Sequence, residues 1–173
     1  MASTVRNLDP LRSSALVAQY NKLRHDLLKL KVGTIFHADA STVVSTANAT
    51  DLATSIALAN ALKAAYNTHV ASACSATTGQ GAHIAADATN VIATANASDL
   101  TTAEALANDI KAKANAHRAS TSFHPTADAT NVISSADASD LATLLTLVNE
   151  EWTDINAHFA AAMSSEAIAL VAP

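Results

Sequence analysis

The fold is decided by the stretch Ala86–His117, ADATNVIATANASDLTTAEALANDIKAKANAH, which is present in three recognisable copies. The first copy begins at Ala38 (ADASTVVSTANATDLATSIALANALKAAYNTH) and the third at Ala127 (ADATNVISSADASDLATLLTLVNEEWTDINAH). Aligned on their Asp-Leu pair, the copies are 48 and then 41 residues apart, with seven additional residues after the first copy. A period in this range is typical of repeat architectures, in which one small unit is copied because it cannot bury its apolar face alone.

Each copy consists of a turn-rich part followed by an amphipathic helix. The turn-rich part contains Asp and Asn, which bond back to nearby backbone amides, and a β-branched pair, which favours extended chain. The Asp-Leu pair follows, and its Asp complements the dipole of the helix that begins there. Helices are therefore predicted at about 51–71, 99–119 and 140–163. Their expected N-caps are Thr50, Ser98 and Ser139.

The N-terminal segment is predicted to form a further helix, over residues 10–32. Asp9 and Pro10 are typical of the first positions of a helix, and Gly33 is typical of a helix end. Apolar residues recur within this segment at a 4-3-4-3 spacing, as in the seam of a coiled coil. The residues of this candidate interaction seam are Leu16, Tyr20, Leu23, Leu27 and Leu30. Spacing alone leaves open whether the seam packs on the repeats or on another chain.

These elements predict an all-α fold, with an N-terminal helix followed by three helical repeats in one bundle-like domain. The parts are residues 1–35, 36–82, 83–122 and 123–173. The connections are long: a helix of about 20 residues spans about 30 Å, whereas as many extended residues reach about 65 Å. Extended returns would lay successive helices parallel, and loops packed over the ends would give an antiparallel bundle. We favour a bundle with ordered, turn-rich returns.

Charge and composition argue against several classes of protein. The chain has 10 Lys and Arg against 15 Asp and Glu, a formal net charge of −5. Residues 1–31 hold six of the basic residues, which fits either a basic end docking on an acidic partner or a solvated helix face. Basic residues are too few for a nucleic-acid groove, and no apolar run is long enough to span a membrane. The single cysteine excludes an internal disulfide.

Histidine is the main candidate for chemistry. Three histidines end the predicted repeat helices in the pattern Asn-x-His, and two others precede an Asp by four residues. These are His69, His117 and His158, and His83 and His124, respectively. They would make zinc sites if they converged with the carboxylates, or they would bond to helix carbonyls and neighbouring Asp side chains. Because the chain has no HExxH motif and no Cys/His cluster, we assign no metal ligand and no cofactor.

Asparagine recurs in the middle of the predicted helices, at Asn60, Asn108 and Asn149. Asn is unfavourable in a helix interior. The repeated Asn therefore either makes a buried hydrogen bond to a return segment, which would fix its register, or is exposed. The sequence has no hydrolase elbow, phosphate loop or nicotinamide fingerprint. We assign no catalytic residue and predict that the protein is not an enzyme.

The repeat phrase ADATNVI…ADASDLAT…LVN…INAH, flanked by His, resembles Ala/Thr-rich repeats in virion structural proteins of tailed bacteriophages. The resemblance covers about residues 36–160. It implies a small non-enzymatic component of the particle, attached to the head, neck or tail in many copies. Its partners would be other virion proteins or further copies of itself in a homo-oligomer or symmetric assembly. It would be made in the host cytoplasm and reside in the virion, without nucleic acid or membrane as a partner.

Three functions are therefore predicted from the sequence. The first is a structural or decoration component of a phage particle that acts through repeated protein–protein contacts. The second is a metal- or ligand-binding helical repeat module that uses the repeated His and Asp. The third is a cytosolic scaffold protein that dimerises through a short coiled coil. Metal analysis separates the first two, and the size of the protein in solution addresses the third.

Overall fold

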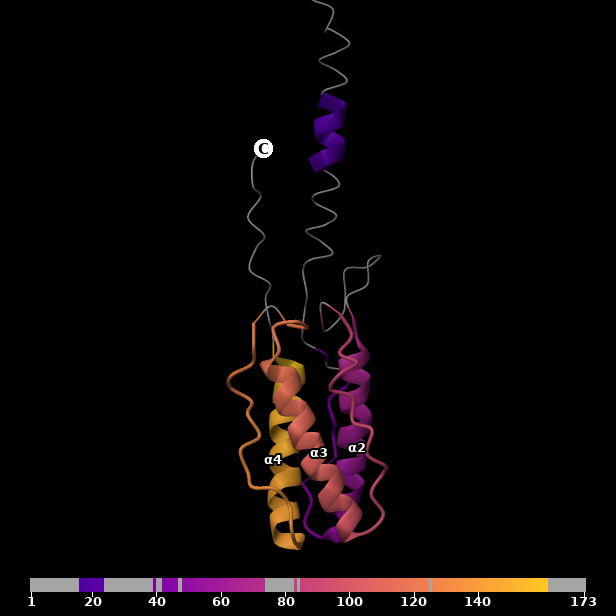
Figure 1. Ribbon diagram of the computed structural model, residues 1–173, viewed down its shortest axis with the longest axis vertical. Coiled ribbons are helices and arrows are strands. Elements are labelled where there is room, and N and C mark those ends of the chain that lie inside the picture. Colours follow the sequence, from indigo (N-terminus) through magenta and orange to yellow (C-terminus); the bar gives the residue numbers. More distant parts are fainter. Residues whose placement is uncertain are drawn as a thin grey trace, which may run out of the picture.

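A computed structural model shows the repeats as a bundle of helices that all run in the same direction (Figure 1). The structure describes residues 16–23, 39, 42–46, 48–73, 83, 85–124 and 126–161. The three repeat helices are α2 (Leu52–Ala71), α3 (Leu100–Ala119) and α4 (Leu141–Ala160), each of 20 residues. Within the described ranges there is no β-strand, only an isolated bridge between Ala73 and His83. The predicted all-α, bundle-like fold is confirmed.

The helices begin one residue later than the sequence prediction placed them, because the N-cap is the Asp of each Asp-Leu pair. In α2 the Asp51 carboxylate accepts a hydrogen bond from the Thr54 backbone N–H at 2.8 Å, and Thr54 Oγ1 accepts one from the Asp51 N–H at 3.0 Å. This reciprocal capping box satisfies two backbone donors at the helix start. The same arrangement begins α3 at Asp99 and α4 at Asp140. The expected caps Thr50, Ser98 and Ser139 are therefore wrong by one position.

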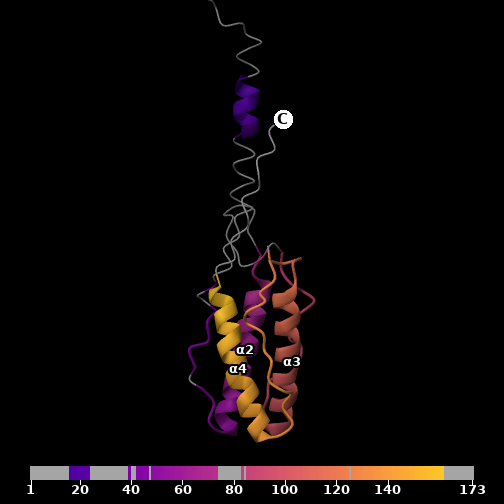
Figure 2. The same ribbon diagram turned by 90° about the vertical axis from the view of Figure 1, so that its left-hand side faces the viewer.

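The described part of each connection runs along the outside of the bundle as extended chain (Figures 1 and 2). Along α2, Asn67 near the helix end contacts Ile92, and Asn60 one to two turns earlier contacts Ala97. The chain therefore runs from the end of α2 back towards its beginning before α3 starts. Parallel helices with extended returns are thus the arrangement that the chain adopts, and the antiparallel alternative is wrong.

The register of each return is fixed by asparagine side chains that pair with backbone as a neighbouring strand would. Asn60 accepts from the Ala97 N–H at 2.8 Å and donates to the Ala97 carbonyl at 3.0 Å. Five more asparagines bond both backbone groups of one residue in the same way: Asn67 with Ile92, Asn108 with Ala138, Asn115 with Ile133, Asn149 with Ala49, and Asn156 with Val44. These backbone groups would otherwise lie part-buried without partners, at a cost of about 1–3 kcal/mol each. The interpretation that the repeated Asn hydrogen-bonds to a return segment is confirmed, and these bonds are part-buried.

The first return segment closes the three repeats into a ring. Residues 42–46 and 48–50 pack on α4, about 100 residues later in the chain, through Asn149 and Asn156. Trp152 adds a hydrogen bond from its indole N–H to the Val44 carbonyl at 2.9 Å. The segment between α2 and α3 occupies the equivalent place on α2, and the segment between α3 and α4 does so on α3. Each groove between neighbouring helices is thus covered by a return.

The core lies between the three helices and combines small and branched side chains. Its fully buried members include Leu58, Ala59 and Leu62 of α2, Leu106, Ala107 and Ile110 of α3, and Leu144, Leu147 and Val148 of α4. Ala59 and Ala107 occupy equivalent positions in α2 and α3, and their small side chains let the helices approach closely. Tyr66 supplies the bulk that Ala114 lacks, and its hydroxyl donates to the Lys113 carbonyl at 2.9 Å.

The predicted N-terminal helix is confirmed where the structure describes it. Residues 16–23 are helical, and Leu16, Tyr20 and Leu23 of the candidate seam are 67%, 65% and 52% exposed. The remainder of the predicted 10–32 helix, with Leu27 and Leu30, lies outside the described residues. At the other end of the chain, α4 ends at Ala160 rather than at the predicted residue 163.

Candidate metal centre

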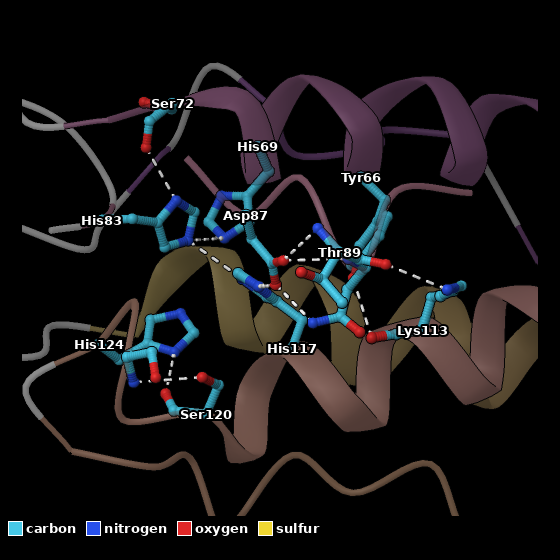
Figure 3. Close-up of polar contacts among 12 residues, drawn as sticks. Tyr66, His69, Ser72, His83, Asp87, Thr89, Lys113, His117, Ser120 and His124 are labelled. Carbon is cyan, nitrogen blue, oxygen red and sulfur yellow. Dashed lines mark hydrogen bonds and ion pairs between the residues drawn. The ribbon is translucent and has the colours of Figure 1, made fainter. Parts of the chain in front are cut away.

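Five histidines meet at the end of the bundle where the three helices finish. His69, His117 and His158 lie in the last turns of α2, α3 and α4, and His83 and His124 come from the returns that follow α2 and α3. All five side chains are buried, and the most exposed of them is His158 at 4%. In Figure 3, dashed lines join His83 to both His69 and His117, and His124 lies below His83, next to Ser120.

The three helix-end histidines form a nearly equilateral triangle. Their ring centroids are 5.4 Å apart for His69 and His158, 5.5 Å for His117 and His158, and 5.6 Å for His69 and His117. The regularity follows from the repeat, because each histidine occupies the same position in its helix and the helices are parallel. One sequence pattern therefore delivers three imidazoles to one point.

The two histidines from the returns lie over two edges of this triangle. The His83 ring is 4.5 Å from the His69 ring and 4.7 Å from the His117 ring. His83 Nε2 lies 3.1 Å from Nε2 of each of these two histidines. The His124 ring is 4.6 Å from that of His117 and 5.2 Å from that of His158.

The outward-facing nitrogen, Nδ1, of each histidine lies near an oxygen that accepts hydrogen bonds. His117 Nδ1 is 2.8 Å from Asp87 Oδ2, and His158 Nδ1 is 2.8 Å from Asp128 Oδ2. The corresponding distance from His69 Nδ1 to Asp39 Oδ2 is 3.5 Å. In the returns, His83 Nδ1 is 2.8 Å from the Ser72 carbonyl, and His124 Nδ1 is 3.0 Å from the Ser120 carbonyl.

The aspartates at Asp87 and Asp128 are themselves held in their ionised form. Asp87 accepts hydrogen bonds from the Thr89 and Asn90 backbone N–H groups, at 3.0 Å each, and from the Asn90 side chain. Burial raises the pKa of Asp87, but the hydrogen bonds from Asn90 and His117 outweigh it, and the pKa lies below its ordinary value. Burial likewise raises the pKa of Asp128, but the hydrogen bonds from Asn131 and His158 outweigh it, and the pKa lies well below its ordinary value.

The backbone places these aspartates as firmly as it places the histidines. The Asp87 N–H donates to the Val70 carbonyl at 2.8 Å, and the Asp128 N–H donates to the Arg118 carbonyl at 2.8 Å. The Asp39 N–H donates to the Phe159 carbonyl, also at 2.8 Å. Each aspartate thus starts a return at the C-terminal end of a helix, beside the histidine of a neighbouring helix.

The hydrogen-bond pattern sets the chemistry of the inward-facing nitrogens. A neutral imidazole has one N–H and one lone pair. Because the Ser72 carbonyl and the ionised Asp87 can only accept, Nδ1 of His83 and of His117 is the donor, and when both rings are neutral each Nε2 presents a lone pair. Two lone pairs 3.1 Å apart in a buried site repel each other. A cation between them removes the repulsion.

The site therefore has the features of a transition-metal centre. One ring nitrogen from each of His69, His117, His124 and His158 lies within 4.8 Å of the other three. His83 Nε2 lies 3.1 Å from Nε2 of His69 and of His117. Imidazole nitrogen is a preferred ligand of zinc, copper, iron and nickel. The carboxylates and carbonyls on Nδ1 are the outer partners that orient metal-bound histidines and raise their basicity.

The sequence pattern anticipated part of this arrangement. The interpretation that the repeated histidines bond to neighbouring Asp side chains is confirmed for His117 and His158. The sequence does not show that all five histidines meet, and for this reason no metal ligand was assigned from it. The seam residues Leu16, Tyr20 and Leu23 lie on a different helical segment and do not contribute side chains to this centre.

No protein-family model, curated protein or solved structure matches the chain. The chain is defined by its fold, a ring of three parallel helical repeats, and by the histidines that line one end of that ring. In the described part of the chain, no helix combines the length and apolarity needed to cross a membrane.

Proposed function

We propose that this protein is a metal-binding structural module, in which a divalent first-row transition-metal ion ties together the ends of the three repeat helices. The observation that carries the proposal is the pair of 3.1 Å contacts from His83 Nε2 to His69 and His117 Nε2, in a site where Nδ1 faces acceptors. A single ion can coordinate several of these nitrogens at once, whereas one proton can be shared by only two of them.

The charges around the site favour a divalent ion over protonated histidine. Asp39, Asp87 and Asp128 surround the imidazoles and supply negative charge close to the ion. A buried imidazolium loses its hydration, and several of them at 5 Å spacing would repel each other. Imidazole coordinated to a metal keeps its Nδ1–H bond to the carboxylate, so the outer hydrogen bonds are retained.

The burial of the ligands supports a structural role for the ion. His69, His83, His117 and His124 have no exposed surface. Structural metal sites are closed by protein ligands, whereas catalytic sites keep a position that substrate can reach. The ion would join α2, α3, α4 and two returns, in addition to the hydrogen bonds that pair His117 with Asp87 and His158 with Asp128 at this end.

Metal analysis of the tag-free chain tests the proposal. We expect about one tightly held transition-metal ion per chain after purification or after loading with Zn²⁺, Ni²⁺ or Co²⁺ followed by desalting. Replacing His117, which contacts both His83 and Asp87, by Ala should lower the affinity by more than about tenfold. Thr101→Ala, exposed at the opposite end of the same helix, is the matched control and should bind normally. Absence of any bound ion from folded wild-type protein would refute the proposal.

A second proposal, from the resemblance to virion repeats, is that this module serves as a non-enzymatic structural component of a bacteriophage particle. The observation in its favour is the exposed apolar stripe of Leu16, Tyr20 and Leu23 on the helical segment at residues 16–23. A stripe of this kind at coiled-coil spacing is typical of a surface that binds another helix. We propose further copies of this chain, or other virion proteins, as its partners.

Size in solution tests this assembly. The wild-type chain should sediment as an oligomer, and the double variant Leu16→Ala, Leu23→Ala should sediment as a monomer with unchanged helix content. Gln19→Ala, on the same exposed segment but off the stripe, should leave the oligomer intact. A wild-type chain that is monomeric at every concentration would contradict self-association, and loss of helicity in the double variant would identify the stripe as internal core.

A further inference from the structure

We infer that the groove between the first return and α2 is a docking site for a glutamate side chain of a partner protein. The groove is a hollow of about 400 Å³, lined by residues 42–46 of the return and by four small side chains of α2, which include Ala61 and Ala65. None of the five histidines is among its lining residues. The docking site is therefore separate from the proposed metal centre, and it goes beyond the proposed function.

The hollow lies where α2 departs from the repeat pattern. The residue ten positions after each N-cap Asp is Glu150 in α4 and Asp109 in α3, but Ala61 in α2. Both acids bond to the return that leads into their own helix. One turn further along, α2 has Ala65 where α3 has Lys113. The two alanines therefore leave space beside the first return where the other helices have longer side chains.

The donors that hold the carboxylate in the third repeat are matched in the first. Glu150 Oε1 accepts from the N–H and the hydroxyl of Ser134, at 2.9 and 2.8 Å, and Oε2 accepts from the Ser135 N–H at 2.7 Å. Ser45 and Thr46 occupy these two positions in the first repeat, and both line the hollow. Within the described part of the chain, no group accepts a hydrogen bond from either of them. Their N–H and hydroxyl groups are therefore free to bind a group that enters from outside.

The lining selects an ionised carboxylate. Two backbone N–H groups and two hydroxyl groups can donate here, and a carboxylate has two oxygens that only accept. In the third repeat, burial acts to raise the pKa of Glu150, but bonds from the equivalent donors lower it to about 2. The longer acid is the better fit. Glu150 receives bonds from two successive residues of its return, whereas among the described residues Asp109 receives one, from the Thr94 hydroxyl at 2.6 Å.

A carboxylate that belongs to a protein suits the hollow better than a free ion does. The described residues that line it carry no charge, so they offer hydrogen bonds of modest strength and no ionic attraction. The lining also includes apolar side chains that reach solvent, Val43 at 41% exposure and the exposed Ala64. Protein interfaces combine such an apolar surface with a few directed polar contacts. The partner is thus a protein segment that presents a glutamate beside apolar residues.

Amide NMR spectra of the full chain, titrated with capped glutamate (N-acetylglutamic acid N-methylamide), test for this docking site. The Ser45 and Thr46 resonances should shift and saturate in the millimolar range, because one side chain stands in for a whole partner surface. The capped glutamine analogue has the same shape but no charge. It should bind about fivefold more weakly, since hydrogen bonds to a charged acceptor contribute more.

Ala61→Glu provides the carboxylate from α2 itself, as Glu150 does from α4. This variant should abolish the shifts that capped glutamate causes at Ser45 and Thr46. Ala57→Glu, exposed one turn earlier on the same helix and not among the lining residues, is the matched control and should leave the shifts unchanged.

Three results would overturn the inference. The first is the absence of saturable shifts at Ser45 and Thr46, or equal binding of the glutamine analogue. The second is a folded Ala61→Glu variant that still binds capped glutamate normally. The third is micromolar binding of free glutarate, which would assign the hollow to a small dicarboxylate rather than to a protein. The wild-type titrations need no variant, so the test holds even if Ala61→Glu fails to fold.

Discussion

Removal of the metal ion is expected to lower the melting temperature of the repeat bundle by roughly 10–20 °C. An ion that binds only the folded chain adds about 4 kcal/mol to the free energy of unfolding when its free concentration is about 1,000 times its Kd. Thermal unfolding of metal-loaded and chelated protein, followed by circular dichroism, measures the difference. The size of the expected effect reflects the position of the site, where all three helices and two returns meet.

The physical reason lies in the state of the site without the ion. The inward lone pairs of His83 and His117 then face each other at 3.1 Å in a buried space. Relief requires a proton, a water molecule or a movement of the return that carries His83. Each of these weakens the packing of the helix ends, so the apo protein should melt earlier and first at this end.

His117→Ala provides the control for this prediction. It removes the imidazole that contacts His83 and weakens binding, so chelator should lower the melting temperature of the variant by clearly less than that of the wild type. Thr101→Ala should keep the full difference between loaded and chelated protein. If wild-type protein melts at the same temperature with and without chelator while ion binding is verified, the ion is not a structural tie.

The helices of this fold were predictable because their signals are local. The Asp-Leu pair and the apolar stripe lie within each repeat, so one reading applied three times gave α2, α3 and α4 to within a few residues. The N-cap was misplaced by one residue because Ser, Thr and Asp all cap helices. Only the position of the Thr at N3, which reaches back to the Asp N–H, distinguishes Asp51 from Thr50.

The direction of the helices was not predictable from local signals, and the candidate site depended on it. Antiparallel helices would have placed His117 at the opposite end from His69 and His158, so no cluster would form. The contacts that decide the direction are those of Asn60 with Ala97 and of Asn67 with Ile92. The later residue of the helix pairs with the earlier residue of the return, so the return runs antiparallel to the helix. The sequence shows the repeated Asn, but it does not show their partners.

Ring closure was also beyond sequence reasoning. The first return, which contains Val44 and Ala49, packs on Asn156 and Asn149 of α4 about 100 residues later. Its sequence is similar to that of the other two returns, which indicates the same local structure. It does not show on which helix the segment packs. Once the helices are parallel and three in number, the groove between α4 and α2 is the place left for it.

Replacing Glu151 by Leu is expected to stabilise the bundle, by about 1–3 kcal/mol at neutral pH. Glu151 is fully buried and occupies the repeat position of Leu62 and Ile110, which are also fully buried. Among the described residues neither of its carboxyl oxygens has a hydrogen-bond partner. Burial raises the pKa of Glu151 well above its ordinary value, because the low-dielectric core disfavours the carboxylate.

The pH dependence of this gain follows from the direction of the shift. A carboxyl whose pKa is raised in the folded state contributes its full stability below the unfolded value, about 4.5, and loses it as pH rises towards the folded value. The advantage of Glu151→Leu over wild type should therefore be smallest near pH 4 and grow as the pH increases. Urea unfolding at a series of pH values measures it.

The adjacent residue Glu150 is the matched control, since its environment is the reverse. Its carboxylate accepts hydrogen bonds from Ser134 N and Oγ and from Ser135 N, at 2.9, 2.8 and 2.7 Å. Burial acts to raise the pKa of Glu150, but these bonds outweigh it and lower the pKa to about 2. Glu150→Leu should therefore destabilise the bundle above pH 4.5, and this loss should fade as the pH falls towards 2. If Glu151→Leu instead destabilises at neutral pH, the buried carboxyl has a partner that its environment requires.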